Sequence, residues 1–376
     1  MDFNSVRSLA PMVDKVTYLE TPARGLYVKP VAEYAHNAIT GWENFDVDIT
    51  NDKLRKDVNQ KVAKLLKVDA KNVTCTNCTS HGLSIIANSF PWKENDNLII
   101  SESEHPNNFY PWAQLKNKGV NIKIAKSENG FIDINNIISL VDDNTKVIAV
   151  SLVSFYPGAY NDVKKLKELL KNKQVYIVLD VIQAFGFLPI YPEELGVDAL
   201  ATASYKGLMS PHGGGVMYVN DDLLHLLSPD EVTMLNVSDR GLFPVLDYSL
   251  ISSADKLQPM PINISQLASM SAALDIILDL GIEEIGTHLN KLAKAMIIGL
   301  NKIGIETKLS ADDPRLKHIV CFDKEDAKEL EDFARENKLY LSARRTGIRM
   351  GFHIYNNMND VERALDIIAK YYKKAR

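Results

Sequence analysis

Cysteine is scarce in this sequence: only three of its 376 residues are cysteines. So few cysteines exclude a secreted domain built on a framework of disulfide bonds. The formal net charge is −5 and no block of like charges is present, which argues against a basic nucleic-acid-binding surface. Residues 1–16 lack the apolar core of a signal peptide. We therefore expect a cytoplasmic protein with no nucleic-acid partner.

Long apolar runs are also missing. The most apolar helical stretch, from Leu267 to Ile282, contains Asp275 and Asp279, which predicts a buried helix and no membrane partner. The sequence has no G-x-G-x-x-G, Walker A, H-E-x-x-H or G-x-S-x-G motif. The commonest signatures of dinucleotide-binding proteins, nucleotide triphosphatases, zinc proteases and serine hydrolases are thus absent.

Cys75 and Cys78 form a C-x-x-C pair. A thioredoxin-like dithiol would need a different fold context, and a zinc site would need a second pair of ligands, whereas Cys321 is isolated. We expect two small buried residues here and no metal site. A thiol- or metal-dependent protein built on this pair remains an alternative.

Short apolar runs alternate with amphipathic helical patterns between residues 50 and 220. The runs are rich in Val and Ile and do not alternate with polar residues, which is typical of strands covered on both faces. They are 97–101, 122–125, 146–153, 175–179, 199–204 and 215–219. Helical spacing is clear in Leu54, Val58, Val62 and Leu65, and again from Val163 to Leu170. The alternation predicts an α/β fold with a mostly parallel central sheet between helices.

The pattern changes after about residue 250. A Pro- and Met-rich segment, 257–262, leads into long helices, including one from about 285 to 303. Two short strands at 318–322 and 339–342 then bracket a helix at 325–337, and a last helix follows. We predict an N-terminal arm (1–15), a large α/β domain (16–250) and a small C-terminal α+β domain (251–376).

Chemically distinctive residues follow these predicted strands, at the edge where an open parallel sheet binds its ligands. Asp180 directly follows one strand, and Gln183 comes three residues later. A buried carboxylate at that place could face a protonated pyridine nitrogen, although a helix cap or a structural ion pair is the alternative. Lys206 follows another strand. In a poorly solvated site its amine would become a better nucleophile, whereas the alternative is an exposed surface lysine.

Two further segments follow strands in the same way. Thr79 and Ser80 begin an apolar helix, where hydroxyls and free N–H groups can bind an anion, although simple helix capping is an equal alternative. His105 precedes Pro106, a favourable first helical residue, and its ring could stack on a bound aromatic ring. A merely exposed histidine is the alternative.

These segments resemble the class V aminotransferases, within fold type I of the pyridoxal 5'-phosphate (PLP) enzymes. DVIQAFGFLPI and VDALATASYKGLMSPHGGGVMYV are similar to the core of that family, and NVTCTNCTSHGL, SEHPNNFYPW and IRMGFHIYNNMNDVERAL extend the resemblance from about residue 16 to the end. YKGL and VSFYPGAYNDV are most similar to its isopenicillin N epimerase-like branch, near the cysteine desulfurases. The resemblance implies a PLP-dependent enzyme that acts on the α-carbon of a small amino acid as a homodimer.

The resemblance also implies a role for each matching residue. Lys206 would carry PLP as a Schiff base, Asp180 would pair with its ring nitrogen, and His105 would stack on the ring. Arg349 would bind the substrate carboxylate, with a surface salt bridge as the alternative. The remaining implied contacts are Gln183 and Ser154 to the ring hydroxyl, and Thr79, Ser80 and Tyr205 to the phosphate.

The sequence departs from the family in two places. The desulfurase branch has a nucleophilic cysteine shortly before the matching arginine, but LYLSARRTGIR contains none, so we expect no classical cysteine desulfurase. Cys321 lies in an apolar run and is expected to be buried and inert. KLQPMPINI also lacks the threonine that reaches the partner subunit's phosphate in the family. A PLP-binding protein of the same fold with little catalysis is therefore a second alternative.

Overall fold

A seven-stranded sheet forms the centre of the computed structural model, which describes residues 1–44, 50–171, 173–239, 246–258, 261–344 and 346–374. In spatial order its strands are β2 (Val73–Thr76), β10 (Gly215–Val219), β9 (Ala199–Ala203), β8 (Tyr176–Asp180), β7 (Thr145–Ser151), β3 (Asn97–Ser101) and β4 (Asn121–Ala125). All neighbours pair in parallel except β10, which is antiparallel to both β2 and β9. The mostly parallel sheet predicted from the apolar runs is confirmed.

The inner strands of the sheet are buried on both faces, which explains why they are apolar without alternation, whereas the edge strand β4 is partly exposed. Ile148 and Val150 of β7 belong to one hydrophobic cluster, whereas Val147 and Ala149 belong to a second one. Helices of the first cluster include α3 (Asn51–Leu66) and α7 (Val163–Leu170), and those of the second include α4 (Thr79–Ser89), α5 (Pro106–Ala113) and α9 (Asp221–Leu226). Other elements of this part are α6 (Ile134–Ser139), α8 (Pro192–Leu195), the hairpin β5 (Ser127–Glu128) and β6 (Phe131–Ile132), and the short helices η1 (Ala70–Asn72), η2 (Gln114–Lys118) and η3 (Ala254–Leu257).

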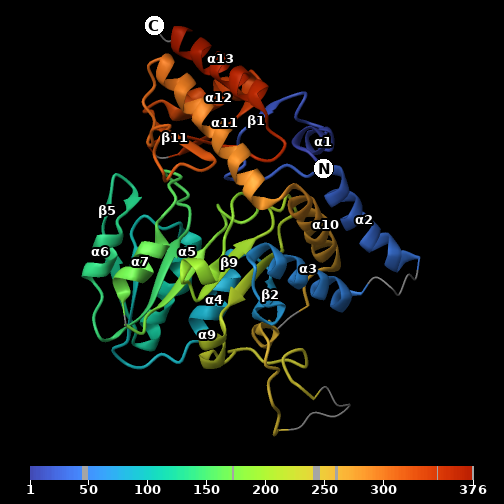
Figure 1. The fold of residues 1–376 in the computed structure, drawn as a ribbon, viewed down its shortest axis with the longest axis vertical. Coiled ribbons are helices and arrows are strands. Elements are labelled where there is room, and N and C mark those ends of the chain that lie inside the picture. Colours follow the sequence, from blue (N-terminus) through green and yellow to red (C-terminus); the bar gives the residue numbers. More distant parts are fainter. Residues whose placement is uncertain (45–49, 172, 240–245, 259–260, 345, 375–376) are drawn as a thin grey trace.

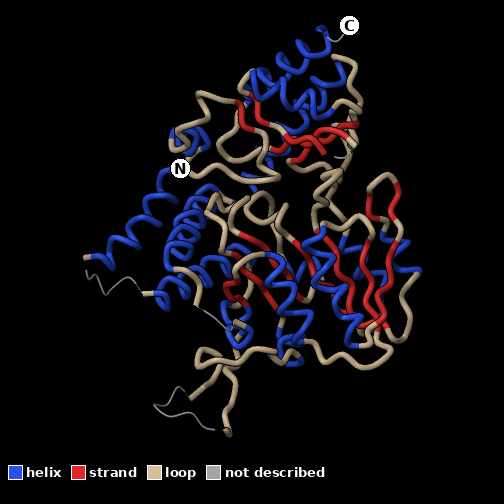
Figure 2. The backbone as a smooth tube through the Cα atoms, turned by 180° about the vertical axis from the view of Figure 1, so that it is seen from behind, coloured by secondary structure: helices blue, strands red, loops and turns tan. Residues whose placement is uncertain are grey.

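The C-terminal part forms a second layer beyond the carboxyl edge of the sheet (Figures 1 and 2). Its three-stranded antiparallel sheet has the order β11 (Ile319–Asp323), β14 (Gly347–Gly351) and β13 (Ser342–Arg344). The helices are α11 (Ile282–Lys302), α12 (Ala327–Glu336) and α13 (Met358–Lys374). The predicted strand 339–342 is divided into β12 (Leu339–Tyr340) and β13, because Leu341 pairs with neither partner strand.

The N-terminal segment packs on this C-terminal part. β1 (Thr17–Tyr18) pairs in parallel with β12, and Arg7 of α1 (Phe3–Ser8) forms an ion pair with Asp360, 2.8 Å apart. α10 (Ile264–Leu280) packs instead against α2 (Lys29–Glu43) and α3 (Figure 1). The predicted domain boundary at residue 251 stays a prediction, and Met260 of the Pro- and Met-rich segment lies outside the described residues.

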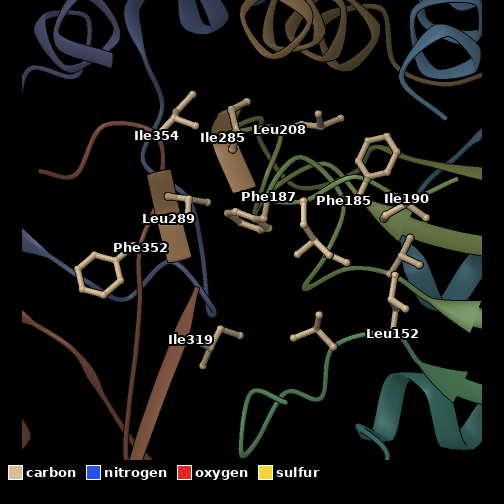
Figure 3. Close-up of a cluster of buried hydrophobic side chains, with 14 of the residues drawn as sticks. Leu152, Phe185, Phe187, Ile190, Leu208, Ile285, Leu289, Ile319, Phe352 and Ile354 are labelled. Carbon is tan, nitrogen blue, oxygen red and sulfur yellow. The ribbon is translucent and has the colours of Figure 1, made fainter. Parts of the chain in front are cut away.

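A shared core joins the two parts. Figure 3 shows Phe187, from the loop after β8, beside Leu289 and Ile285 of α11, whereas Phe185 of the same loop lies near Ile190; Ile319 of β11 belongs to the same cluster. All of these side chains are buried. The small sheet is thereby held close to the carboxyl edge of the large sheet. In the part of the chain that the structure describes, no single helix is long and apolar enough to cross a membrane; α10 and α11 pass such a test only together, and they are bent by 81°.

Candidate active site

The predicted site residues of the large sheet lie at one edge. β2, β9, β8, β7 and β3 run in the same direction, since β10 is antiparallel to both β2 and β9. Their carboxyl ends lead to five predicted positions: Thr79, Lys206, Asp180, Ser154 and His105. The placement expected from the sequence is therefore what the structure shows, while the role of each residue stays a prediction.

Asp180 is the last residue of β8 and is buried, with 3% of its surface exposed. It lies between Ser151 of β7 and Ala201 of β9, and its Oδ1 accepts a hydrogen bond from the Ile182 amide at 2.9 Å. Burial raises the pKa of its carboxyl group, and the nearby Lys206 charge opposes that rise. Within the described residues it has no ion pair, so the structural salt bridge considered for it is wrong.

Lys206 is 7% exposed, so the surface-lysine alternative is wrong. Burial lowers the pKa of its amine, and the positive charge of Arg349 lowers it further. Its backbone is fixed on two sides: the Gly25 amide donates to the Tyr205 carbonyl at 2.9 Å, and Nε2 of His353 lies 3.2 Å from the Lys206 carbonyl oxygen. A Cβ at position 25 would lie 2.4 Å from that same carbonyl oxygen.

Asp180 and Lys206 influence each other electrostatically but do not form a direct ion pair. Both side chains are buried at the carboxyl ends of adjacent strands. An acid and an amine that share a site without an ion pair between them can each contact a different atom of one ligand. That arrangement suits a flat ring that presents a cationic nitrogen to Asp180 and a carbonyl group to Lys206.

The N-terminus of α4 offers unused donors. Its N-cap is Cys78, which makes no side-chain capping bond, so the idea that Thr79 and Ser80 cap the helix is wrong. Thr79 Oγ1 is buried and has no hydrogen-bond partner among the described residues, and Ser80 Oγ contacts only the Cys78 thiol, 3.3 Å away. Free N–H groups and hydroxyls at a helix N-terminus bind anions such as phosphate.

Gln183 and Ser154 are both buried at this edge. Nε2 of Gln183 donates to the Pro22 carbonyl at 2.9 Å, while its Oε1 has no partner in the described part of the chain. Ser154 Oγ accepts from Nδ2 of Asn161 at 3.2 Å, which leaves its own O–H free to donate. Each residue therefore has a polar atom available for a ligand.

His105 is half-buried and precedes α5, where Pro106 is the first residue. Its Nδ1 accepts from the Asn107 amide at 3.1 Å, and its ring meets Phe155 edge-on with centroids 5.1 Å apart. Burial and the charge of Lys206 lower its pKa to about 4, so the ring is neutral. Tyr205 stacks on His212 with a centroid distance of 4.0 Å.

Arg349 lies on β14 and is 3% exposed. Its Nη1 donates to the Phe155 carbonyl at 2.9 Å, and its Nε has no partner among the residues described. Burial and the neighbouring Arg344 charge lower its pKa to about 9. The surface salt bridge considered for Arg349 is therefore wrong: it is a buried guanidinium with donors to spare.

Two residues of the site were not singled out from the sequence. Glu104 is buried beside His105; Ser151 donates to it from both amide and hydroxyl, at 2.7 and 2.5 Å, and Nδ2 of Asn108 donates at 2.8 Å. Burial raises its pKa to about 7. His353 holds the Lys206 carbonyl from the C-terminal part. In the sequence, Glu104 directly precedes His105, and His353 follows the strand that carries Arg349; these positions could have drawn attention to both residues.

PLP, which the resemblance implies, fits this set of residues. The unpartnered buried atoms Thr79 Oγ1 and Gln183 Oε1 lie at the same edge as the buried Lys206 and Asp180. Together they offer an anion site, a polar contact for a ring substituent, an amine and an acid. These are the groups that a phosphorylated pyridine aldehyde requires.

The two cysteines of the C-x-x-C pair lie on and just after β2. Cys75 is fully buried on β2, its Sγ lies 3.4 Å from Asn59 Oδ1, and burial raises its pKa to about 12. Both cysteines are free thiols, but Cys78, at the start of α4, is only half-buried, so the expectation of two buried residues is wrong for Cys78. In the described segments no three His, Cys, Asp or Glu side chains could hold a metal ion together. Cys321 on β11 is buried, as expected, and its pKa is also raised to about 12.

Comparison with known proteins identifies the family of the chain. Residues 29–364 match the family described as aminotransferase class-V. An uncharacterized aminotransferase of Schizosaccharomyces pombe is 27% identical over 84% of this chain and 81% of its own length. A probable cysteine desulfurase of Pyrococcus abyssi is 24% identical over 99% of this chain and 98% of its own length.

Solved structures share the fold. A cysteine desulfurase from Thermococcus onnurineus superimposes with a TM-score of 0.86 at 20% identity and covers 98% of both chains. The cystine C–S lyase bound to cysteine persulfide gives a TM-score of 0.87 at 17% identity over 96% of this chain and 99% of the other. Since the family match covers most of the sequence, this chain belongs to the class V aminotransferases, the fold type I family whose cofactor is PLP.

Proposed function

We propose that this chain is a PLP-dependent enzyme that acts at the α-carbon of a small amino acid, with Lys206 carrying the cofactor. The observation that carries the proposal is the pair of buried groups on adjacent strands, the Lys206 amine and the Asp180 carboxylate. Burial makes the amine a better nucleophile because it favours the neutral form. The acid is placed to keep a ring nitrogen protonated.

The other residues position the cofactor. Thr79 and Ser80, with the free N–H groups of α4, bind the phosphate, and Tyr205 adds its hydroxyl. Gln183 and Ser154 contact the ring hydroxyl. Their support is that Thr79 Oγ1 and Gln183 Oε1 have no partner among the described residues. The neutral ring of His105 stacks on the cofactor ring.

Arg349 binds the substrate carboxylate. Its buried guanidinium keeps unused N–H groups, and a planar fork of donors matches a carboxylate well. The cofactor supplies an electron sink for the bond that breaks at the α-carbon. Lys206 then moves a proton at that carbon, since a lowered pKa lets its amine accept and return a proton near neutral pH. Transamination, epimerisation and elimination share these steps and differ in which bond breaks and where the proton returns.

Desulfuration through a loop cysteine is not the reaction that we propose, although relatives are named cysteine desulfurases. Residues 339–348 contain no cysteine, and Cys321 is buried with a raised pKa. A protonated buried thiol is a poor nucleophile. Within the family we place the chain nearest the isopenicillin N epimerase-like branch, on the segments YKGL and VSFYPGAYNDV.

A cytoplasmic homodimer is the form in which we propose the enzyme works. α2 exposes several large apolar side chains, which a second subunit would cover: Tyr34 is 50% exposed, Ile39 58% and Trp42 52%. Contiguous exposed apolar surface of this kind is typical of a protein–protein contact. Figure 1 shows α2 extending along the side of the molecule away from the central sheet.

Trapping of the cofactor tests this function. Wild-type protein incubated with PLP and reduced with borohydride should gain the mass of one reduced cofactor on the peptide that contains Lys206. Lys206→Ala should gain none, while Lys256→Ala, another partly buried lysine of lowered pKa, should behave as wild type. Addition of single amino acids should then change the visible absorption. Labelling of Lys206→Ala at the wild-type level would refute the proposal, and labelling without any response to amino acids would favour a PLP-binding protein with little catalysis.

A further inference from the structure

Two arginines lie on the same face of the small sheet. β13 and β14 pair antiparallel, with Ser342 opposite Arg349 and Arg344 opposite Gly347. Side chains two residues apart on a strand point to the same face, so Arg344 shares a face with Ser342 and therefore with Arg349. The two arginines are diagonal neighbours, a position from which long side chains reach one another's surroundings.

Neither guanidinium has a carboxylate partner in the described part of the chain. Arg349 donates to the Phe155 carbonyl at 2.9 Å, and Arg344 donates to the Ala343 carbonyl at 3.0 Å. Several other arginines of the protein are paired with acids; Arg55, for example, forms ion pairs with Asp52 and Asp255. A guanidinium as buried as that of Arg349, with its Nε unpartnered, is costly unless an anion compensates for it.

The shared face connects Arg344 with the candidate active site through Arg349. In agreement with that register, the charge of Arg344 lowers the pKa of Lys206, of His105 and of Arg349. The charge of Glu20 raises the pKa of Arg349, and Oε1 of Glu20 accepts a hydrogen bond from Ser342 Oγ at 3.3 Å. Among the described residues Glu20 forms no ion pair with either arginine, and one carboxylate at a distance does not balance two guanidinium groups.

One guanidinium suffices for the α-carboxylate of an amino acid, because a planar fork binds a carboxylate with two parallel hydrogen bonds. The second is left without a role in the function proposed above. We propose that Arg344 binds an anionic group on the substrate side chain, and that the substrate is therefore an acidic amino acid. This inference rests on the proposed function and names the substrate class of that same site.

The recognition would work by charge at both ends of the substrate. Arg349 holds the α-carboxylate, and Arg344 holds a side-chain carboxylate on the same face of the sheet. A neutral amino acid loses one charge-assisted hydrogen bond and leaves Arg344 unpaired. Such a bond is worth enough to change affinity by about tenfold or more.

Titration of the PLP-loaded protein tests this inference. The change in visible absorption is followed against the concentration of aspartate, glutamate, alanine and cysteine. Wild type should respond to aspartate or glutamate at about tenfold lower concentration than to alanine or cysteine. Arg344→Gln should abolish that preference, and Arg344→Lys should restore part of it. Arg335→Gln, which removes an exposed arginine of the same part of the chain, should leave the preference unchanged.

The outcomes separate the inference from the function on which it rests. If alanine and cysteine bind as well as aspartate and glutamate, or if Arg344→Gln weakens all four equally, the substrate class is wrong while the enzyme remains. If Lys206 carries no cofactor, the proposed function itself fails. PLP affinity is measured for every variant; a loss of cofactor in Arg344→Gln would show that Arg344 serves the cofactor and would overturn the inference.

Discussion

Asp180→Asn should weaken cofactor binding without weakening the fold. The substitution keeps the size of the side chain, and an asparagine oxygen can still accept the Ile182 amide that now lies 2.9 Å from Oδ1. It removes the negative charge that would pair with the ring nitrogen of PLP. A hydrogen bond to a charged group contributes roughly 1.5–3 kcal/mol, so the dissociation constant for PLP should rise about 10- to 100-fold.

In the protein without cofactor, Asp180→Asn should leave the free energy of unfolding unchanged or raise it. Asp180 is 3% exposed, and burial raises its pKa, which means that the folded chain bears a cost for its charge. Replacing a buried charge by a neutral group of the same shape is often neutral or stabilising, so we expect a change within about 1 kcal/mol or a gain. Urea denaturation of the apo-protein at pH 8 measures this quantity.

Asp198→Asn is the matched control. Asp198 is also a buried carboxylate beside the central sheet, and it accepts the Ile177 amide at 2.7 Å, but it precedes β9 at the opposite edge. This variant should bind PLP as the wild type does. If Asp180→Asn keeps full PLP affinity, or if its affinity falls only in step with a loss of apo-protein stability, the assigned pairing between the acid and the ring is refuted.

Three further changes test how the site is held. His353→Phe should lower the free energy of unfolding by about 1–3 kcal/mol and shift the pH titration of the cofactor's visible band, because Nε2 of His353 donates to the Lys206 carbonyl. His353→Gln keeps a donor and should recover part of both effects. A titration that does not shift would show that His353 has only a structural role. Gly25→Ala should lower the free energy of unfolding by about 1–3 kcal/mol and lower PLP occupancy, because the new Cβ would lie 2.4 Å from the Lys206 carbonyl oxygen. Thermal unfolding and a PLP titration measure the two effects, and wild-type values in both would contradict the close contact. Glu104→Gln should change the pH dependence of the unfolding free energy. The pKa of Glu104 in the folded protein, about 7, exceeds the ordinary 4.5, so its stabilising contribution is present below pH 4.5 and is lost as the pH rises through 7. A difference between variant and wild-type unfolding free energies that does not depend on pH would contradict this.

The strands were predictable because the sheet is buried on both faces. Ile148 and Val150 point into one cluster and Val147 and Ala149 into the other, so all four central positions of β7 are apolar and the run stands out in the sequence. The direction of a strand leaves no such mark. β10 has the same apolar pattern as its neighbours, yet it runs antiparallel to both of them, and only its pairing in the folded chain reveals that.

Strand ends were less predictable than strands. The apolar run of β7 was expected to reach residue 153, but the strand ends at Ser151. Leu152 and Val153 are still buried, so the apolar run in the sequence continues beyond the last residue that pairs in the sheet. The pairing of β1 with β12 joins residues more than 300 positions apart, and neither two-residue strand has a pattern long enough to recognise.

Sequence reasoning found the site residues whose type and position alone indicate their chemistry. It missed the residues whose importance depends on contacts that form only in the fold. A carboxylate or an amine directly after an apolar run conflicts with its surroundings, and that conflict singled out Asp180 and Lys206. Glu104 follows a strand too, but its importance depends on Ser151 and Asn108, which close around it only in the fold. The same holds for His353, whose partner is a backbone carbonyl 147 residues away.

The contacts that sequence reasoning missed are also those that join the two sheets. Arg349 of the small sheet donates to the Phe155 carbonyl in the loop after β7, and His353, just beyond the same strand, contacts the Lys206 carbonyl after β9. The strand that bears the proposed substrate-binding arginine is thus fixed to the loop that bears the reactive amine. A shift of the small sheet would move Arg349 and the Lys206 backbone together. If Arg349 binds the substrate as proposed, we expect that binding to be coupled to the position of the Lys206 amine, and His353 to act as a positioning residue although it presents no reactive group to a ligand.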